Sequence, residues 1–214
     1  AIGFQALRGS ETPSNNTGIR NTAIGGGALM SNSSGQYNVA VGSLSLYKNT
    51  TGNRNVAIGD GSLYENINGF RNTALGTIAL QSNTSGSSNV SIGDLALYNN
   101  TTGFNNTVIG TDSMVDNISG YYNTSIGSNS LYHNKSKSES VAVGYEAMYY
   151  ADDSTDGGSS YNTALGYQAL MGSSTPSNNT GVSNTAIGNK SLQLNTSGSF
   201  NVGVGPSTLN DNTT

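Results

Sequence analysis

The chain has 214 residues, of which 34% are hydrophobic and 9% charged, and its formal net charge is −4. This mild acidity, without a basic stripe, argues against a nucleic acid partner. The absence of cysteine excludes disulfides and thiolate metal sites. No apolar run approaches the roughly 18 to 20 residues of a membrane helix, so we expect no membrane insertion in this segment.

Glycines recur along the chain with a strict period. Eight of the eleven intervals between them are 17 residues long and three are 22. Each follows an Ile, Val or Leu, and a Leu or Met stands four residues after it. Such a period indicates one structural unit stacked on itself, a single repeat domain over residues 1–214 with about twelve coils, which we expect to be a fragment of a longer fibre. The period also argues against an enzyme. These key glycines are Gly3, Gly25, Gly42, Gly59, Gly76, Gly93, Gly110, Gly127, Gly144, Gly166, Gly188 and Gly205.

Each unit carries two short apolar segments bounded by turn residues, which is typical of strands rather than helices. We expect an all-β parallel β-solenoid with two strands per coil. The Ile before each key glycine and the Leu after it are expected to meet inside. The Ala between Thr or Val and Ile then faces outward, packed against another chain, although the reverse assignment stays open. The key glycines permit a positive φ or a tight corner.

Asparagine occupies two further positions of the unit. One row precedes the first strand and a second row marks the other turn. Stacked amides can bond along the stack, each donating to the carbonyl of the next. The first row is Asn21, Asn38, Asn55, Asn72, Asn89, Asn106, Asn123, Asn162, Asn184 and Asn201; the second is Asn32, Asn49, Asn66, Asn83, Asn100, Asn117, Asn134 and Asn195.

Three units are longer by five residues, with the additions over about 8–20, 149–161 and 171–183. Insertions in solenoids form loops on one face, often the binding face. The candidate ligand-binding residues are therefore Tyr149, Tyr150, Asn178 and Asn179. The alternative is that these are tolerated surface loops without a ligand.

The middle insertion contains Asp152, Ser154 and Asp156, followed by Gly157. Oxygen ligands at alternating residues before a glycine match the opening of a calcium loop, although Thr163 stands where its bidentate Glu would be. The sequence thus allows a calcium site or a solvated acidic loop. No other cofactor is expected.

Tyrosine follows the Leu position in five units, at Tyr47, Tyr64, Tyr98, Tyr132 and Tyr149. Such a row could stack sugars, but packing at a trimer interface is favoured. His133 is the single histidine and is expected to be solvated, and no base is evident to activate a serine, so no catalytic residue is predicted.

The Asn-Thr-Ala-Ile-Gly units resemble the head repeats of YadA-like trimeric autotransporter adhesins, which are left-handed parallel β-rolls wound into trimers. They also resemble repeats of phage tail-fibre proteins, whose units end in Asn-Thr-Thr-Gly turns, as within Asn99 to Gly103. The units here are longer than the usual adhesin head unit. The resemblance implies a homotrimeric left-handed β-roll.

From these observations we expect a structural or adhesive extracellular fibre on a cell surface or virion. It would present a repetitive surface to a host-cell receptor or a surface glycan. The alternatives are the receptor-binding shaft of a phage tail fibre and a surface filament that assembles end to end.

Overall fold

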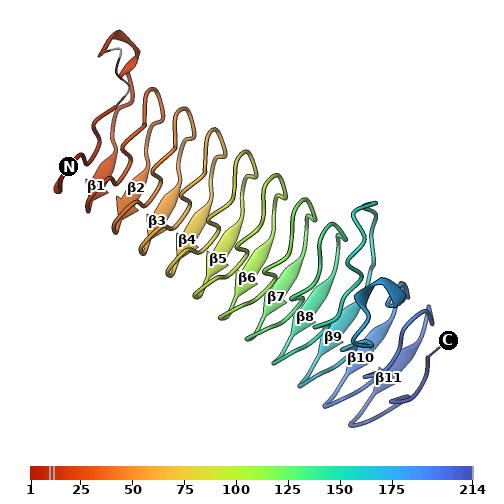
Figure 1. The fold of residues 1–214 in the computed structure, drawn as a ribbon. Helices are drawn as coiled ribbons and strands as arrows, with labels where there is room; N and C mark the ends of the chain where they lie inside the picture. Colours follow the sequence, from red (N-terminus) through yellow and green to blue (C-terminus); the bar gives the residue numbers. More distant parts are fainter. Residues whose placement is uncertain (10, 12, 214) are drawn as a thin grey trace.

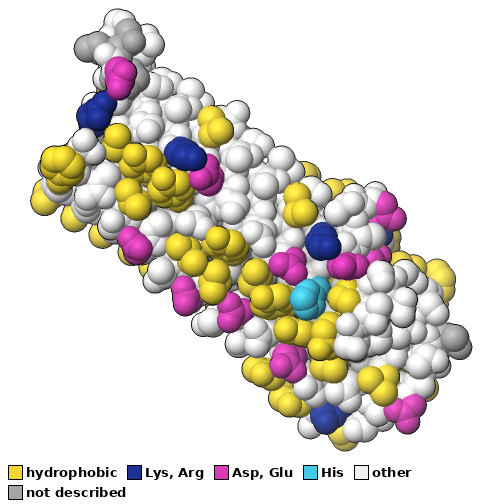
Figure 2. Space-filling view, in the orientation of Figure 1, with side chains coloured by type: hydrophobic (Ala, Val, Ile, Leu, Met, Phe, Trp, Pro, Cys, Tyr) yellow, Lys and Arg dark blue, Asp and Glu magenta, His cyan; other side chains and the backbone are white. Residues whose placement is uncertain are grey.

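The computed structural model describes residues 1–9, 11 and 13–213. Ser10 and Thr12 of the first insertion lie outside the described residues. The chain forms a rod in which one short strand from each coil joins an 11-stranded parallel sheet in sequence order (Figure 1). Most of the surface in the space-filling view is neither apolar nor charged, which agrees with the low content of charged residues (Figure 2). The predicted parallel β-solenoid with 17-residue coils is confirmed.

Every strand is three residues long, and like positions of adjacent coils pair directly, as Ala23 does with Ala40. Two short 3-10 helices, η1 (Pro13–Asn15) and η2 (Pro176–Asn178), lie in the first and last insertions. The strands are β1 (Thr22–Ile24), β2 (Val39–Val41), β3 (Val56–Ile58), β4 (Thr73–Leu75), β5 (Val90–Ile92), β6 (Thr107–Ile109), β7 (Thr124–Ile126), β8 (Val141–Val143), β9 (Thr163–Leu165), β10 (Thr185–Ile187) and β11 (Val202–Val204).

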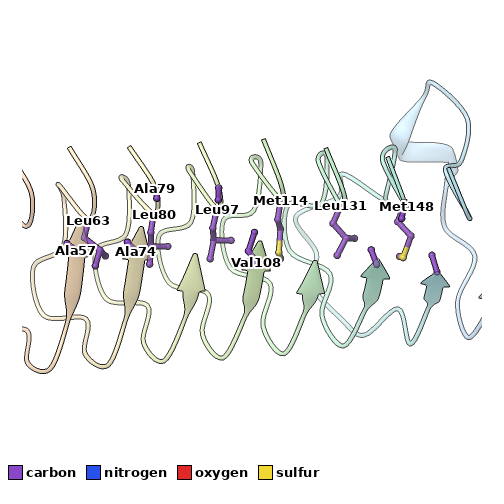
Figure 3. Close-up of a cluster of buried hydrophobic side chains, with 14 of the residues drawn as sticks. Ala57, Leu63, Ala74, Ala79, Leu80, Leu97, Val108, Met114, Leu131 and Met148 are labelled. Carbon is purple, nitrogen blue, oxygen red and sulfur yellow. The ribbon is translucent and has the colours of Figure 1, made fainter. Parts of the chain in front are cut away.

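The middle residue of each strand points into the coil, so the preferred assignment of Ile inside and Ala outside is wrong. Ala57 and Ala74 are fully buried and lie beside Leu63 and Leu80, whereas Ile58 remains 39% exposed (Figure 3). The reason is the small volume available inside the coil. A one-layer coil must hold the Leu row and a second row of small residues at the Ala or Ser position before it, and this leaves room only for a small strand residue.

The second apolar segment of each coil is a chain of turns rather than the predicted second strand. Leu29 has a φ of 50° and Gly27 a φ of 69°, so left-handed residues alternate with right-handed ones. The N–H of Leu29 still donates to the carbonyl of Ser45 one coil away at 3.0 Å. The coils therefore remain hydrogen-bonded to each other here without extended backbone.

The key glycines confirm the predicted corner. Their φ values lie between 120° and 140°. A Cβ atom built on Gly76 would come within 2.4 Å of the carbonyl oxygen of Gly93 in the next coil. Since only glycine fits so close to a neighbouring backbone, this position fixes the stacking distance of the coils.

Both asparagine rows form the predicted amide ladders inside the rod. In the second row, Asn49 Nδ2 donates to Asn32 Oδ1 at 2.8 Å and to Gly52 O at 3.1 Å. In the first row, Asn38 Oδ1 accepts the backbone N–H of Asn55 at 3.0 Å, while Asn38 Nδ2 donates to the same Gly52 O at 2.8 Å. One turn carbonyl therefore ties the two rows together in each regular coil; it belongs to a glycine except in the coil where Lys137 takes that position.

Candidate functional site

The outer face of the sheet is the largest continuous feature of the surface. Along each strand the first and third side chains face away from the core. Leu75 is 43% exposed, Leu165 is 47% exposed and Ile24 is 40% exposed. The outward row of third positions comprises Ile24, Val41, Ile58, Leu75, Ile92, Ile109, Ile126, Val143, Leu165, Ile187 and Val204. A strip of branched apolar side chains thus takes the place of the alanine surface expected from the sequence.

The second candidate site lies where the first of the two consecutive long coils stacks on the 17-residue coil before it. The carboxylates of the predicted calcium loop gather around one ammonium group. Lys137 Nζ lies 3.3 Å from Asp152 Oδ2 and 2.9 Å from Asp156 Oδ1, and it also donates to Gly157 O at 2.8 Å. Ser154 joins the two carboxylates, because its N–H donates to Asp152 Oδ1 at 2.9 Å and its hydroxyl to Asp156 Oδ1 at 2.7 Å.

The ionisation of this cluster follows from its hydrogen bonds. The hydroxyl of Ser154, and then the ammonium of Lys137, hold the pKa of Asp156 below its usual value. Burial alone would lower the pKa of Lys137, but its hydrogen bond to Asp156 and the nearby charge of Asp152 outweigh burial and raise it. The loop is therefore an ion-paired unit at neutral pH.

The structure brings Asp152, Ser154 and Asp156 together with a lysine among them that the sequence reasoning missed. Among the described residues, no group of three or more acidic, histidine or cysteine side chains could hold a metal ion. Lys137 precedes the loop by one coil. It takes the place of the turn glycine found in most coils, and aligning the sequence by its period would have shown this substitution.

Of the four predicted ligand-binding residues, Tyr149 and Tyr150 join an aromatic cluster. The ring of Tyr150 stacks on His133 at 5.7 Å between centroids, and Tyr149 meets Tyr150 edge to face at 4.7 Å. His133 Nδ1 lies 2.9 Å from Asp116 Oδ2, so the histidine is paired and half-buried rather than solvated. It is the cyan patch among the hydrophobic side chains in Figure 2.

The other two predicted residues differ from each other. Asn178 lies exposed in η2. Asn179 is half-buried, and its Nδ2 donates to the carbonyl oxygens of Tyr150 and Ser173. Its amide thus fixes the third insertion to the preceding coil, a structural role that leaves little of this group to bind a ligand.

A small hollow of about 50 Å³ lies beside the two long coils. Its wall includes Asn134, Lys137, Tyr150 and Asn179. Asn134 is fully buried, and its Oδ1 has no hydrogen-bond partner. The reason is that Ala151 occupies the ladder position of the next coil, so the amide ladder ends at this point.

The rings of the tyrosine row contact one another from coil to coil. Tyr47 and Tyr64 stack in adjacent coils, with centroids 5.0 Å apart and planes 4° from parallel. Tyr132 and Tyr149 repeat the contact at 5.3 Å in a tilted arrangement. These rings pack on one another along the rod.

Comparison with family models, with curated proteins and with solved structures found no match to the chain. In the described part of the chain, no helix has the length and apolar character needed to cross a bilayer.

Proposed function

We propose that the chain is a rod-shaped segment of an extracellular homotrimeric fibre with a structural or adhesive role and no catalytic activity. The observation that carries this proposal is the outward apolar strip on the sheet. Eleven strands at about 4.8 Å give a strip about 48 Å long, and with a width of about 10 Å it covers roughly 500 Å². A patch of this size is toward the upper end of the largest apolar patches on soluble monomers, which are often functional, so the strip fits a protein–protein interface.

The chemistry of the strip supports sheet-on-sheet contact. Its side chains are Val, Ile and Leu, and the Thr and Val side chains of the first strand positions lie beside it. Such side chains pack well between sheet faces about 10 Å apart. Three copies around an axis along the rod bury all three strips at once. The resemblance to trimeric β-roll repeats agrees with this number.

Oligomer mass tests the trimer. We expect light scattering on the purified chain to give three times the chain mass. The double variant Ile58→Asp/Ile109→Asp places two carboxylates on the strip and is expected to be monomeric. The control Ser31→Asp/Gln81→Glu, at half-exposed turn positions away from the sheet face, is expected to keep the trimer. A wild-type chain of single mass would contradict the proposal.

Surface binding tests the adhesive part. A rigid trimeric rod repeats each weak contact along and around its axis, so multivalency dominates its affinity. We expect the trimer to bind intact eukaryotic cells or a glycan array about 100-fold tighter than the monomeric variant. Equal binding by the two forms contradicts a multivalent adhesin. An absence of binding by either form leaves a purely structural fibre.

A further inference from the structure

Along strands β1 to β6, the two edges of the outer sheet face carry opposite charges. Farther along the rod, Glu139 stands before β8 and Lys190 after β10, so the opposition is confined to the first six strands. Because all strands run in the same direction, the residue before every strand lies at one edge and the residue after it at the other. Arg20, Arg54 and Arg71 each stand two residues before a strand, and all three are exposed. Three of the four arginines of the chain therefore share one edge, which we call the arginine edge.

The opposite edge is acidic. Asp60 follows β3 and Asp94 follows β5 by two residues, and both are exposed. Asp112 lies three residues after β6 on the same side. We call these three residues the acidic edge. The apolar strip lies between the two edges.

No ion pair between described residues involves the arginine edge or the acidic edge. Arg20 donates a hydrogen bond to the hydroxyl of Tyr37. The other two guanidinium groups lie over aromatic rings, Arg54 over Tyr37 at 5.9 Å and Arg71 over Phe70 at 5.8 Å. These four side chains also line a shallow hollow along the edge. The edge thus offers cations, aromatic surface and a concave shape to a neighbour.

From this arrangement we propose that the arginine edge of one copy of the chain docks against the acidic edge of the next copy. The inference rests on the proposed function, since it concerns how the strips come together. Rotation about an axis parallel to the rod brings unlike edges into contact. A two-fold axis across the rod would instead bring like edges together. The charges therefore select a parallel ring of copies.

The axial register of the charges agrees with such a ring. Arg54 and Asp60 flank the same strand, β3, so they lie at one level of the rod. Arg71 precedes β4. The strands that Asp60 and Asp94 follow, β3 and β5, are the two neighbours of β4, each about 4.8 Å away along the rod. An arginine side chain spans that offset. Copies without axial displacement can therefore form these pairs.

Charge reversal in the full chain tests the docking. Arg54→Glu/Arg71→Glu makes both edges acidic, and like charges in contact are expected to lower the association constant about 100-fold at low salt. Adding Asp60→Lys/Asp94→Lys to the same chain exchanges the edges and is expected to restore association. The control Ser31→Glu/Gln81→Glu adds carboxylates on another face and is expected to leave it unchanged. Far-UV circular dichroism checks that each variant folds.

The outcomes separate the inference from the proposed function. A monomeric wild type overturns both. An oligomer whose mass and salt dependence do not respond to the arginine variants overturns edge docking alone. Binding of a heparin-derived hexasaccharide to the intact oligomer, lost in the arginine variant, would show an open edge and would also overturn it.

Mixing tests the number of copies in the ring. The arginine variant has two acidic edges, and the Asp60→Lys/Asp94→Lys variant has two basic edges. In a ring of three, a mixture of the two always leaves at least one junction between like charges, so we expect mixing to restore association less than the exchanged chain does. Full recovery on mixing would keep edge docking and overturn the trimer.

Discussion

Removal of one amide from the second asparagine ladder is expected to destabilise the rod strongly. Asn83 is fully buried; its Nδ2 donates to Asn66 Oδ1 at 2.8 Å and to Gly86 O at 3.0 Å, and its Oδ1 accepts from Asn100 Nδ2 at 2.9 Å. Asn83→Ala loses three hydrogen bonds worth about 1 kcal/mol each and leaves the oxygen of Asn66 without a donor. Gly86 O keeps the amide of Asn72 at 2.8 Å, so we expect a loss of about 3 kcal/mol in the free energy of unfolding.

The end of the same ladder provides the comparison. Asn134 donates to Asn117 Oδ1 at 3.1 Å and to Lys137 O at 3.0 Å, but its own oxygen accepts nothing. Asn134→Ala is therefore expected to cost about 2 kcal/mol, and the half-exposed Asn99→Ala less than about 0.5 kcal/mol. Urea unfolding followed by circular dichroism at one protein concentration measures all three. A cost for Asn134→Ala equal to or above that of Asn83→Ala would refute the additive reasoning.

Three further outcomes follow from the geometry. Gly76→Ala puts a Cβ atom 2.4 Å from a neighbouring carbonyl oxygen at a φ of 139°. It is expected to lower the free energy of unfolding, measured by thermal unfolding, by at least about 3 kcal/mol. The control Gly26→Ala, whose Cβ atom meets nothing within 4 Å, is expected to be near neutral. Lys137→Met is expected to speed hydrogen exchange in residues 152–157 about tenfold at pH 7. Folding lowers the pKa of Asp156, so the stability that this pair contributes is present above the ordinary aspartate pKa and is lost as the pH falls through the lowered value. The exchange rates of the variant and the wild type are therefore expected to converge in acid. A difference in rate that does not depend on pH would contradict the ion pair. Ala151→Asn supplies a donor to the unpaired ladder oxygen and is expected to raise the free energy of unfolding by about 1 kcal/mol, and a lower stability would show that the long loop needs this space.

The sequence predicts the features that repeat in every unit. The period gives the solenoid, the buried Leu row and the positive φ of the key glycines, since each appears at one fixed position many times. The orientation of the strand does not follow from it. An alternation of period two places Thr22 and Ile24 on one face but does not say which face is inside. Which face points inward depends on the width of the coil. That width is set by turn residues with a positive φ, such as Leu29, and residue propensities do not predict them.

The candidate site is predicted only in part for a related reason. Reasoning along the chain finds the acidic loop of the second insertion, because its residues are consecutive. Lys137 lies 19 residues before Asp156, and His133 lies 17 residues after Asp116. These partners are neighbours only through the stacking of coils. In a solenoid, sites are found by comparing positions one period apart.

The presence of the second-row asparagine in a coil also correlates with the length of that coil. All eight of the 17-residue coils carry Asn seven residues after the key glycine, whereas the three 22-residue coils have Ser10, Ala151 and Ser173 there. The amide closes its corner by bonding the backbone three residues on, as Asn66 does to Gly69 at 3.1 Å. A coil that keeps the amide has a corner of fixed length. New surface loops can therefore arise where this one residue has been lost, while the other coils hold the rod straight.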